Sequence, residues 1–167
     1  MKRIFSLLLA AVCLTVGVNA QDASKPATYI LVRHAEKQAT GGADPALTPE
    51  GEQRAQKLIE TLKGYVPDAV YSTNYIRTRS TVTPLATKFG KEIQLYNPGK
   101  QAEFANQLLD MKGKTVVIVG HSNTIPALVN LLAKNTKFPD WSDSVYDHYF
   151  IVTVNAQGEA SAKEQTF

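Results

Sequence analysis

The chain has 167 residues and carries 18 lysine and arginine residues against 15 aspartate and glutamate residues, a formal net charge of +3. Lys2 and Arg3 supply two of the three excess charges, so the remainder has no overall field that would attract nucleic acid or a membrane surface. The single cysteine, Cys13, lies near the N-terminus, which excludes a disulfide framework, a thiolate metal site and a cysteine nucleophile from the rest of the chain.

The first twenty residues are typical of a cleaved signal peptide. Lys2 and Arg3 precede an uncharged, largely apolar stretch from residue 4 to residue 18, and Val18-Asn19-Ala20 offers the small residues that a signal peptidase recognises. The stretch is short for a bilayer span, and no stop-transfer segment follows it. We therefore expect an exported protein, periplasmic or secreted, without stable membrane insertion. Its expected parts are a signal peptide at residues 1–20, a polar leader at residues 21–27 and one domain at residues 28–167.

The rest of the chain alternates predicted strands and helices. Apolar runs predict strands at residues 28–32, 69–71, 93–96 and 115–119. Helical periodicity and end signals predict helices at residues 48–64, 75–88, 101–111 and 123–134, with Thr48 and Asn123-Thr124 as caps. Residues 149–154 and 160–163 are expected to form two closing strands. This alternation predicts a three-layer α/β/α sandwich with a mostly parallel sheet and an antiparallel edge strand.

Two histidines directly follow two of the apolar runs. Arg33 and His34 come after residues 29–32, and His121 comes after residues 116–120. Ligands of open α/β sheets bind outside the carboxyl ends of the strands, so these side chains can meet if the strands are neighbours. A neutral imidazole can accept a phosphoryl group while arginines, whose donors match phosphate geometry, stabilise its oxygens. The sequence therefore predicts a phosphate pocket in which Arg33, Arg77 and His121 surround His34.

Four segments occur in a fixed order: Leu31-Val32-Arg33-His34-Ala35-Glu36, residues 47–55, residues 71–81 and Val119-Gly120-His121-Ser122. In this order they resemble the histidine phosphatase superfamily, which contains cofactor-dependent phosphoglycerate mutases and many acid phosphatases. Ala35 stands where glycine is more usual in that family. The resemblance covers about residues 28–133. It implies that His34 is phosphorylated, that Arg33, Arg77 and His121 hold the phosphoryl oxygens, and that water then hydrolyses the phosphohistidine. It implies neither a cofactor nor a metal.

The family also uses a carboxylic acid to protonate the leaving group, and this part of the pattern is not matched. No acidic residue stands directly after His121, as it does in the phytase-like branch. Glu103, which follows the third predicted strand, is our candidate for the general acid, with Glu36 and Glu50 as alternatives. Some compact members have no obvious acid, so the role can also be unfilled.

Three other functions remain open at this point. Residues 120–124 approach the G-x-S-x-G nucleophile elbow, which would make a serine hydrolase from Ser122, His148 and either Asp143 or Asp147. A zinc site would need His34, His121 and His148 together. A phosphate-binding module without turnover is the third alternative, because the acid is missing.

The sequence does not specify the substrate. Residues 96–115 leave room for one helix and no large cap domain, so we expect an open pocket and no mutase reaction, which would require a retained intermediate. The candidate substrates are phosphorylated small molecules, phosphorylated envelope sugars and phosphoproteins. We expect a monomer that binds no nucleic acid. Phe138, Trp141 and His148 are expected to have structural roles.

Overall fold

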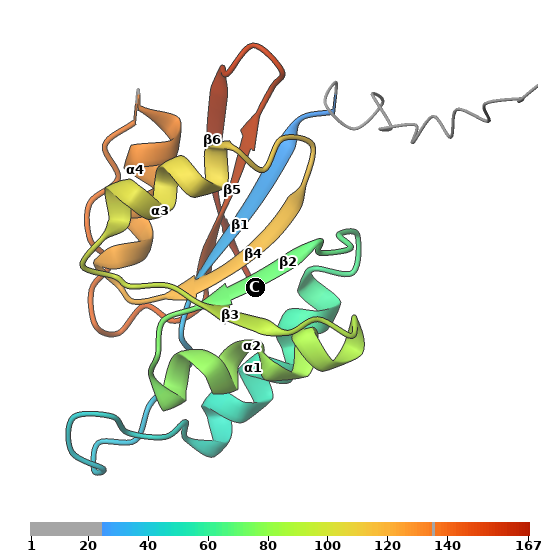
Figure 1. Cartoon of the computed structure of the whole chain (residues 1–167). Helices are drawn as coiled ribbons and strands as arrows, with labels where there is room; N and C mark the ends of the chain where they lie inside the picture. The colour runs from blue at the N-terminus through green and yellow to red at the C-terminus, as the bar shows by residue number, and fades with distance from the viewer. Residues whose placement is uncertain (1–24, 135) are drawn as a thin grey trace, which may run out of the picture.

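The computed structural model describes residues 25–134 and 136–167 (Figure 1). The expected signal peptide at residues 1–20 lies outside the described residues, as does most of the leader. Within the described ranges, no helix is long and apolar enough to cross a membrane.

A six-stranded sheet forms the centre of the domain. Its strands are β1 (Ala27–Arg33), β2 (Ala69–Ser72), β3 (Ile93–Leu95), β4 (Thr115–Gly120), β5 (His148–Val154) and β6 (Ala160–Thr166). They lie in the order β3-β2-β4-β1-β5-β6. Neighbours among β1 to β4 pair in parallel, whereas β5 pairs antiparallel with both β1 and β6. The predicted mostly parallel sheet with an antiparallel edge strand is confirmed, and β1 with β5 forms a further antiparallel pair inside the sheet.

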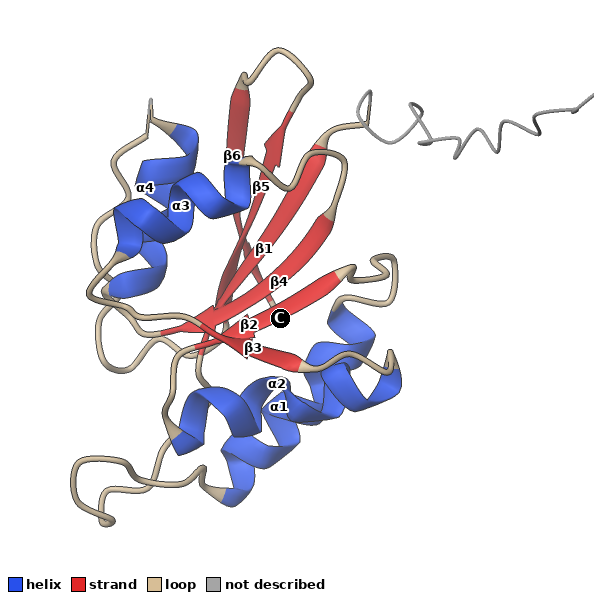
Figure 2. Cartoon of the chain, in the orientation of Figure 1, coloured by secondary structure: helices blue, strands red, loops and turns tan. Residues whose placement is uncertain are grey.

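Helices cover both faces of this sheet, which gives the three layers (Figure 2). The helices α1 (Pro49–Thr61) and α2 (Ile76–Lys88) pack on one face, and α3 (Gln101–Leu109) and α4 (Thr124–Ala133) pack on the other. The sequence of β1 is apolar without interruption because both sides of this strand are buried. Ile30 and Val32 belong to the core under α1 and α2, whereas Tyr29 and Leu31 belong to the core under α3 and α4.

Local capping fixes where the helices begin. The Thr48 hydroxyl accepts a hydrogen bond from the Gly51 backbone N–H at 3.1 Å, and Pro49 occupies the first helical position of α1, as predicted. At α4, Asn123 occupies the N-cap position, but it is the hydroxyl of Thr124 that accepts a hydrogen bond, from the His121 backbone N–H at 2.9 Å. This bond ties the start of α4 to the end of β4.

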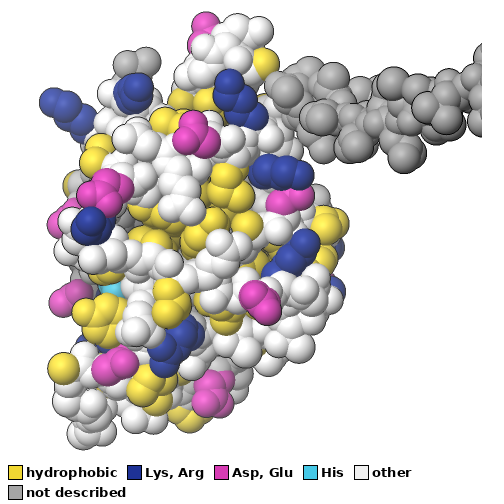
Figure 3. Space-filling model, viewed as in Figure 1, with side chains coloured by type: hydrophobic (Ala, Val, Ile, Leu, Met, Phe, Trp, Pro, Cys, Tyr) yellow, Lys and Arg dark blue, Asp and Glu magenta, His cyan; other side chains and the backbone are white. Residues whose placement is uncertain are grey.

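The segment between α4 and β5 packs back onto the sheet. The Trp141 and Phe150 rings stack at 4.9 Å between centroids, and Phe138 lies against the same core, so the structural roles predicted for Phe138 and Trp141 are confirmed. On the face seen in Figure 3, acidic and basic side chains are interspersed. That surface agrees with the small net charge of the chain.

Candidate active site

The carboxyl ends of β1 and β4 lie side by side, because Arg33 pairs with Gly120 in the parallel register. His34 and His121 follow these two residues, and their ring centroids are 5.4 Å apart. Both histidines line a cavity of about 370 Å³ at this edge of the sheet. Arg33 and Arg77 line it as well, so the structure brings together all four residues singled out in the sequence. Its other lining residues include Lys37, Tyr75, Asn123 and Asp143.

His34 is held in the tautomer that a nucleophile requires. Its Nδ1 lies 2.8 Å from the carbonyl oxygen of Ala35, and a carbonyl can only accept, so Nδ1 carries the hydrogen and Nε2 keeps its lone pair. The side chain is 3% exposed, and burial lowers the pKa of His34 to about 3, against the opposing effect of the bond to Ala35. Arg33 and His121 lower this pKa further. The imidazole is therefore neutral at neutral pH.

Backbone contacts fix the start of the loop that carries His34. The His34 N–H donates to the Gly120 carbonyl at 2.9 Å, and the Ala35 N–H donates to the Thr81 hydroxyl at 2.9 Å. Gly120 itself lies against side chains, since a Cβ atom there would be 2.6 Å from the Tyr96 Oη and 2.9 Å from the Thr124 Oγ1. Only glycine fits this position without displacing those groups.

The ring of His121 is oriented by two buried threonines. The Thr78 hydroxyl donates to the carbonyl oxygens of Thr73 and Tyr75, and the Thr73 hydroxyl donates to Thr78 at 3.0 Å. The Thr73 oxygen, 3.0 Å from the His121 Nε2, is then left to accept a hydrogen bond from that nitrogen. The neutral ring therefore carries its hydrogen on Nε2. Burial lowers the pKa of His121 to about 4, and Arg77 and Arg33 contribute to the shift.

The two arginines are held in different ways. Arg33, 2% exposed, donates to the carbonyl oxygens of Ser142, Val145 and Asp143 at 2.9, 2.5 and 3.2 Å. Its guanidinium carbon also lies 4.1 Å from the centroid of the Tyr146 ring. Through these contacts Arg33 anchors residues 142–146 to the end of β1.

Arg77 lies in the first turn of α2. It makes a single ion pair with Asp44 at 3.3 Å, and its guanidinium carbon is 4.4 Å from the centroid of the Tyr75 ring. The Nε atoms of Arg77 and Arg33 are both buried and have no hydrogen-bond partner in the described part of the chain. Both guanidinium groups nevertheless contribute positive charge to the wall of the cavity, which favours an anionic ligand there.

The structure does not bring the candidate general acids to the cavity. The Glu103 side chain is 72% exposed on α3 and forms an ion pair with Lys100 at 3.1 Å. Glu36 is engaged by Arg54 at 2.6 Å, and Glu50 lies exposed in the first turn of α1. Among the described carboxylates, only Asp143 lines the cavity, and it lies 3.7 Å from Arg33.

The serine hydrolase triad is not assembled either. Ser122 lines the cavity, but the His148 ring faces Glu164 at 2.8 Å and Asp147 at 3.7 Å and is not a lining residue. The zinc alternative also lacks its ligand set, since residues 25–134 and 136–167 contain no cluster of three histidine, cysteine or acidic side chains that could hold a metal. The structural role of His148 stays a prediction, supported by its contact with Glu164 of β6.

Sequence reasoning missed the residues that position the site. Thr73 follows β2 as His34 follows β1 and His121 follows β4, so its place at a strand end was a usable signal. Tyr146 and the carbonyl groups of residues 142–145 had no such signal, because they lie in a segment without secondary structure or a recognisable motif.

Comparisons with known proteins agree with this arrangement. Residues 29–97 match the model of the histidine phosphatase superfamily (branch 1), a span that ends before β4 and His121. No curated protein matches the chain. The family match covers 69 of the 167 residues, so it shows a similarity of this segment to the histidine phosphatase superfamily.

Solved structures share the fold at low sequence identity. The protein histidine phosphatase SixA complexed with tungstate has a TM-score of 0.69 at 16% identity, covering 83% of this chain and 96% of that one. A putative phosphohistidine phosphatase SixA from Nakamurella multipartitia has a TM-score of 0.64 at 24% identity, covering 84% and 95%. The mycobacterial glucosyl-3-phosphoglycerate phosphatase has a TM-score of 0.67 at 13% identity, covering 86% and 99%. These likenesses support the fold assignment.

Proposed function

We propose that the protein hydrolyses phosphoryl compounds through a phosphohistidine formed at Nε2 of His34, without a metal ion. The observation that carries the proposal is the neutral His34 ring, whose Nε2 lone pair is free in a cavity also lined by Arg33 and Arg77. The positive charges of those arginines would attract and stabilise the phosphoryl oxygens.

The reaction has two displacements at phosphorus. In the first, the Nε2 lone pair of His34 forms a P–N bond while the bond to the leaving group breaks, and the leaving group departs with the electron pair. In the second, water attacks phosphorus, the P–N electron pair returns to Nε2, and inorganic phosphate is released. Arg33 and Arg77 stabilise the charge on the phosphoryl oxygens in both steps, because their positive charges are already in place.

His121 contributes in its protonated form. Its Nε2–H is engaged by Thr73, so a second donor toward a phosphoryl oxygen requires a proton on Nδ1 as well. A phosphate dianion raises the pKa of a neighbouring imidazole, and we therefore expect His121 to take up a proton when an oxyanion binds.

The proposed substrates are compounds whose leaving group needs little help from an acid. Among the described carboxylates only Asp143 lines the cavity, and its side chain is fully exposed to water, so the cavity holds no buried acid beside the leaving group. Aryl phosphates and phosphoramidates such as phosphohistidine fit this restriction. The names of two structural neighbours, a protein histidine phosphatase and a putative phosphohistidine phosphatase, support the second class.

The test compares His34→Asn with Ser122→Ala, using 4-nitrophenyl phosphate and phosphohistidine as substrates. His34→Asn is expected to abolish turnover and the acid-labile phosphoenzyme trapped from a radiolabelled substrate, whereas Ser122→Ala keeps both. Loss of turnover in Ser122→Ala with retention in His34→Asn would favour the serine hydrolase. If the unmodified protein bound tungstate but turned over neither substrate, it would be a phosphate-binding module.

A further inference from the structure

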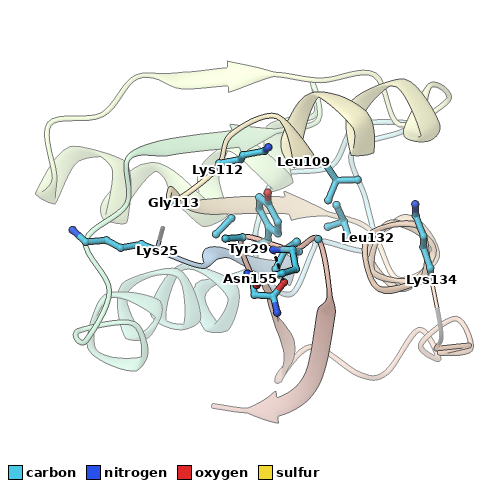
Figure 4. A pocket seen from close by; sticks show the side chains of 13 residues that line it. Lys25, Tyr29, Leu109, Lys112, Gly113, Leu132, Lys134 and Asn155 are labelled. Atoms are coloured by element: carbon cyan, nitrogen blue, oxygen red, sulfur yellow. Dashed lines mark hydrogen bonds between the residues drawn. The ribbon is translucent and has the colours of Figure 1, made fainter. Parts of the chain in front are cut away.

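A second cavity, of about 260 Å³, is shown from close by in Figure 4. It lies at the opposite end of β1 from the candidate active site. It is formed where β1 begins, beside the turn that joins β5 to β6, and Ala27 and Val154 pair across this end. Strand β1 ends at Arg33. At about 3.3 Å per residue, the two cavities are therefore about 20 Å apart along β1.

The inner wall of this cavity is apolar. Tyr29, Leu109, Leu132 and Val154 line it, and Tyr29 forms part of its buried floor. The Tyr29 hydroxyl donates to the Leu108 carbonyl at 2.6 Å, and burial raises the pKa of Tyr29 to about 12, with a smaller contribution from Asp110. The phenol therefore stays neutral with its donor engaged, and the fully buried ring supports the inner wall of the cavity from beneath.

The rim of the cavity is basic. Lys25, Lys112 and Lys134 line it from three different segments, and its lining residues include no aspartate or glutamate. The Lys25 side chain extends away from the other labelled residues in Figure 4, so Lys112 and Lys134 are the lysines available as ligand contacts. The chain outside its N-terminal tripeptide has a net charge near +1, so this rim is a local concentration of positive charge.

The backbone at Lys134 strengthens the case for a ligand. Lys134 has φ of 42° at the C-terminal end of α4, and it is the one non-glycine residue with positive φ among the described residues. Glycine usually occupies such a position because a Cβ atom makes it strained. A lysine in its place puts a charge at the rim despite the strain, and strained positions of this kind cluster at binding sites.

We propose that this cavity binds a small organic anion, with its apolar body on Leu109, Leu132 and Val154 and its charged group beside Lys112 and Lys134. The cavity is smaller than those of drug-sized ligands, so it suits one or two rings or a short alkyl chain. Charge complementarity at the rim selects an acid over a neutral compound of the same shape.

The test is a titration of the 15N-labelled protein with 2-naphthoate and with its neutral counterpart 2-naphthylmethanol, followed by NMR. Naphthoate is expected to shift the amide signals of Gly113 and Gly158, which line the cavity, in a saturable manner, and to leave Gly120 at the active site unmoved. The alcohol is expected to bind about five- to tenfold more weakly, because it lacks the carboxylate that pairs with the lysines. Each exposed pair between a carboxylate and a lysine contributes little binding free energy, so the expected difference is small.

Three variants separate binding from folding. Lys112→Gln and Lys134→Gly should each weaken naphthoate binding about two- to fivefold and leave alcohol binding unchanged, whereas the exposed Lys63→Gln, outside the cavity, serves as the matched control. Lys134→Gly also relieves the positive φ, so it should be at least as stable as the parent while binding the acid less well. Equal affinities for acid and alcohol, or shifts that avoid Gly113 and Gly158, would overturn the proposal.

Discussion

Replacing the two arginines one at a time should separate anchoring from phosphate binding. Arg33→Met is expected to lower both the stability of the protein and its turnover, whereas Arg77→Met is expected to lower turnover and leave stability nearly unchanged. The reason is that Arg33 donates to three carbonyl groups of residues 142–145, while Arg77 has one ion pair, to Asp44. Methionine keeps most of the apolar stem in both variants.

The size of the stability effect follows from these contacts. Each hydrogen bond from a charged group is worth about 1.5–3 kcal/mol, but Ser142 and Asp143 are exposed and their carbonyls regain water in the variant. Removing the charge also relieves the desolvation that lowers the pKa of Arg33. We therefore expect a net loss of about 3 kcal/mol for Arg33→Met. Arg77 is 13% exposed and Asp44 is 37% exposed, and their single ion pair gives about 1 kcal/mol.

Thermal unfolding followed by circular dichroism measures the difference. At about 2–4 °C per kcal/mol for a domain of this size, Arg33→Met should melt about 6–12 °C below the parent protein. Both variants should lose roughly 10²-fold or more in kcat/KM for 4-nitrophenyl phosphate, because each removes a preorganised charge. The reasoning is refuted if Arg33→Met has the same melting temperature as the parent protein, or if the melting temperature of Arg77→Met is lowered by as much as that of Arg33→Met.

Three further predictions concern the histidines and their supports. Gly120→Ala should lower the free energy of unfolding in urea by about 1–3 kcal/mol, because the new Cβ atom meets the Tyr96 hydroxyl. Adding Tyr96→Phe to this variant should recover part of the loss, and no recovery would mean that another contact is responsible. Between pH 6.5 and about 4, His34 and His121 stay neutral in the folded protein but take up protons in the unfolded chain, so the free energy of unfolding should decrease by up to about 2.7 kcal/mol for each pH unit of acidification. In urea titrations at several pH values, His34→Asn should remove about half of this slope. An unchanged slope would contradict the low pKa of His34. Tungstate binding at pH 7 should be accompanied by the uptake of about one proton, measured by calorimetry in buffers of different ionisation enthalpy. Thr73→Val should reduce this uptake, because the His121 Nε2 would no longer be engaged by the Thr73 hydroxyl; equal uptake in the two proteins would rule out this role of Thr73.

The arrangement of strands and helices could be predicted because the local signals agree with the packing. Residues 29–32 are continuously apolar because both faces of β1 are covered, and Thr48 and Pro49 mark the start of α1 by their own chemistry. The convergence of His34 and His121 could be predicted for a related reason. Both follow buried parallel strands, and β1 and β4 are neighbours in the sheet.

What could not be predicted depends on the orientation of side chains across the fold. Glu103 has a suitable position in the chain, but its side chain lies on the exposed side of α3 beside Lys100, and chain position does not fix that orientation. The path of residues 136–147 is likewise set by distant partners. The Asn130 side chain bonds both backbone groups of Phe138, at 2.9 and 2.8 Å, and Arg33 holds residues 142–145.

The anchoring of Arg33 also bears on how the proposed chemistry would be accelerated. Its Nη donors are committed to backbone carbonyls and its plane lies against Tyr146, so the guanidinium is fixed before a substrate arrives. Its positive charge remains in the wall of the cavity. A charge that is already fixed needs no reorganisation as charge develops on the substrate, which is the condition under which electrostatic stabilisation is most effective. Residues 142–146 therefore act on the reaction through Arg33, although only Asp143 among them lines the cavity.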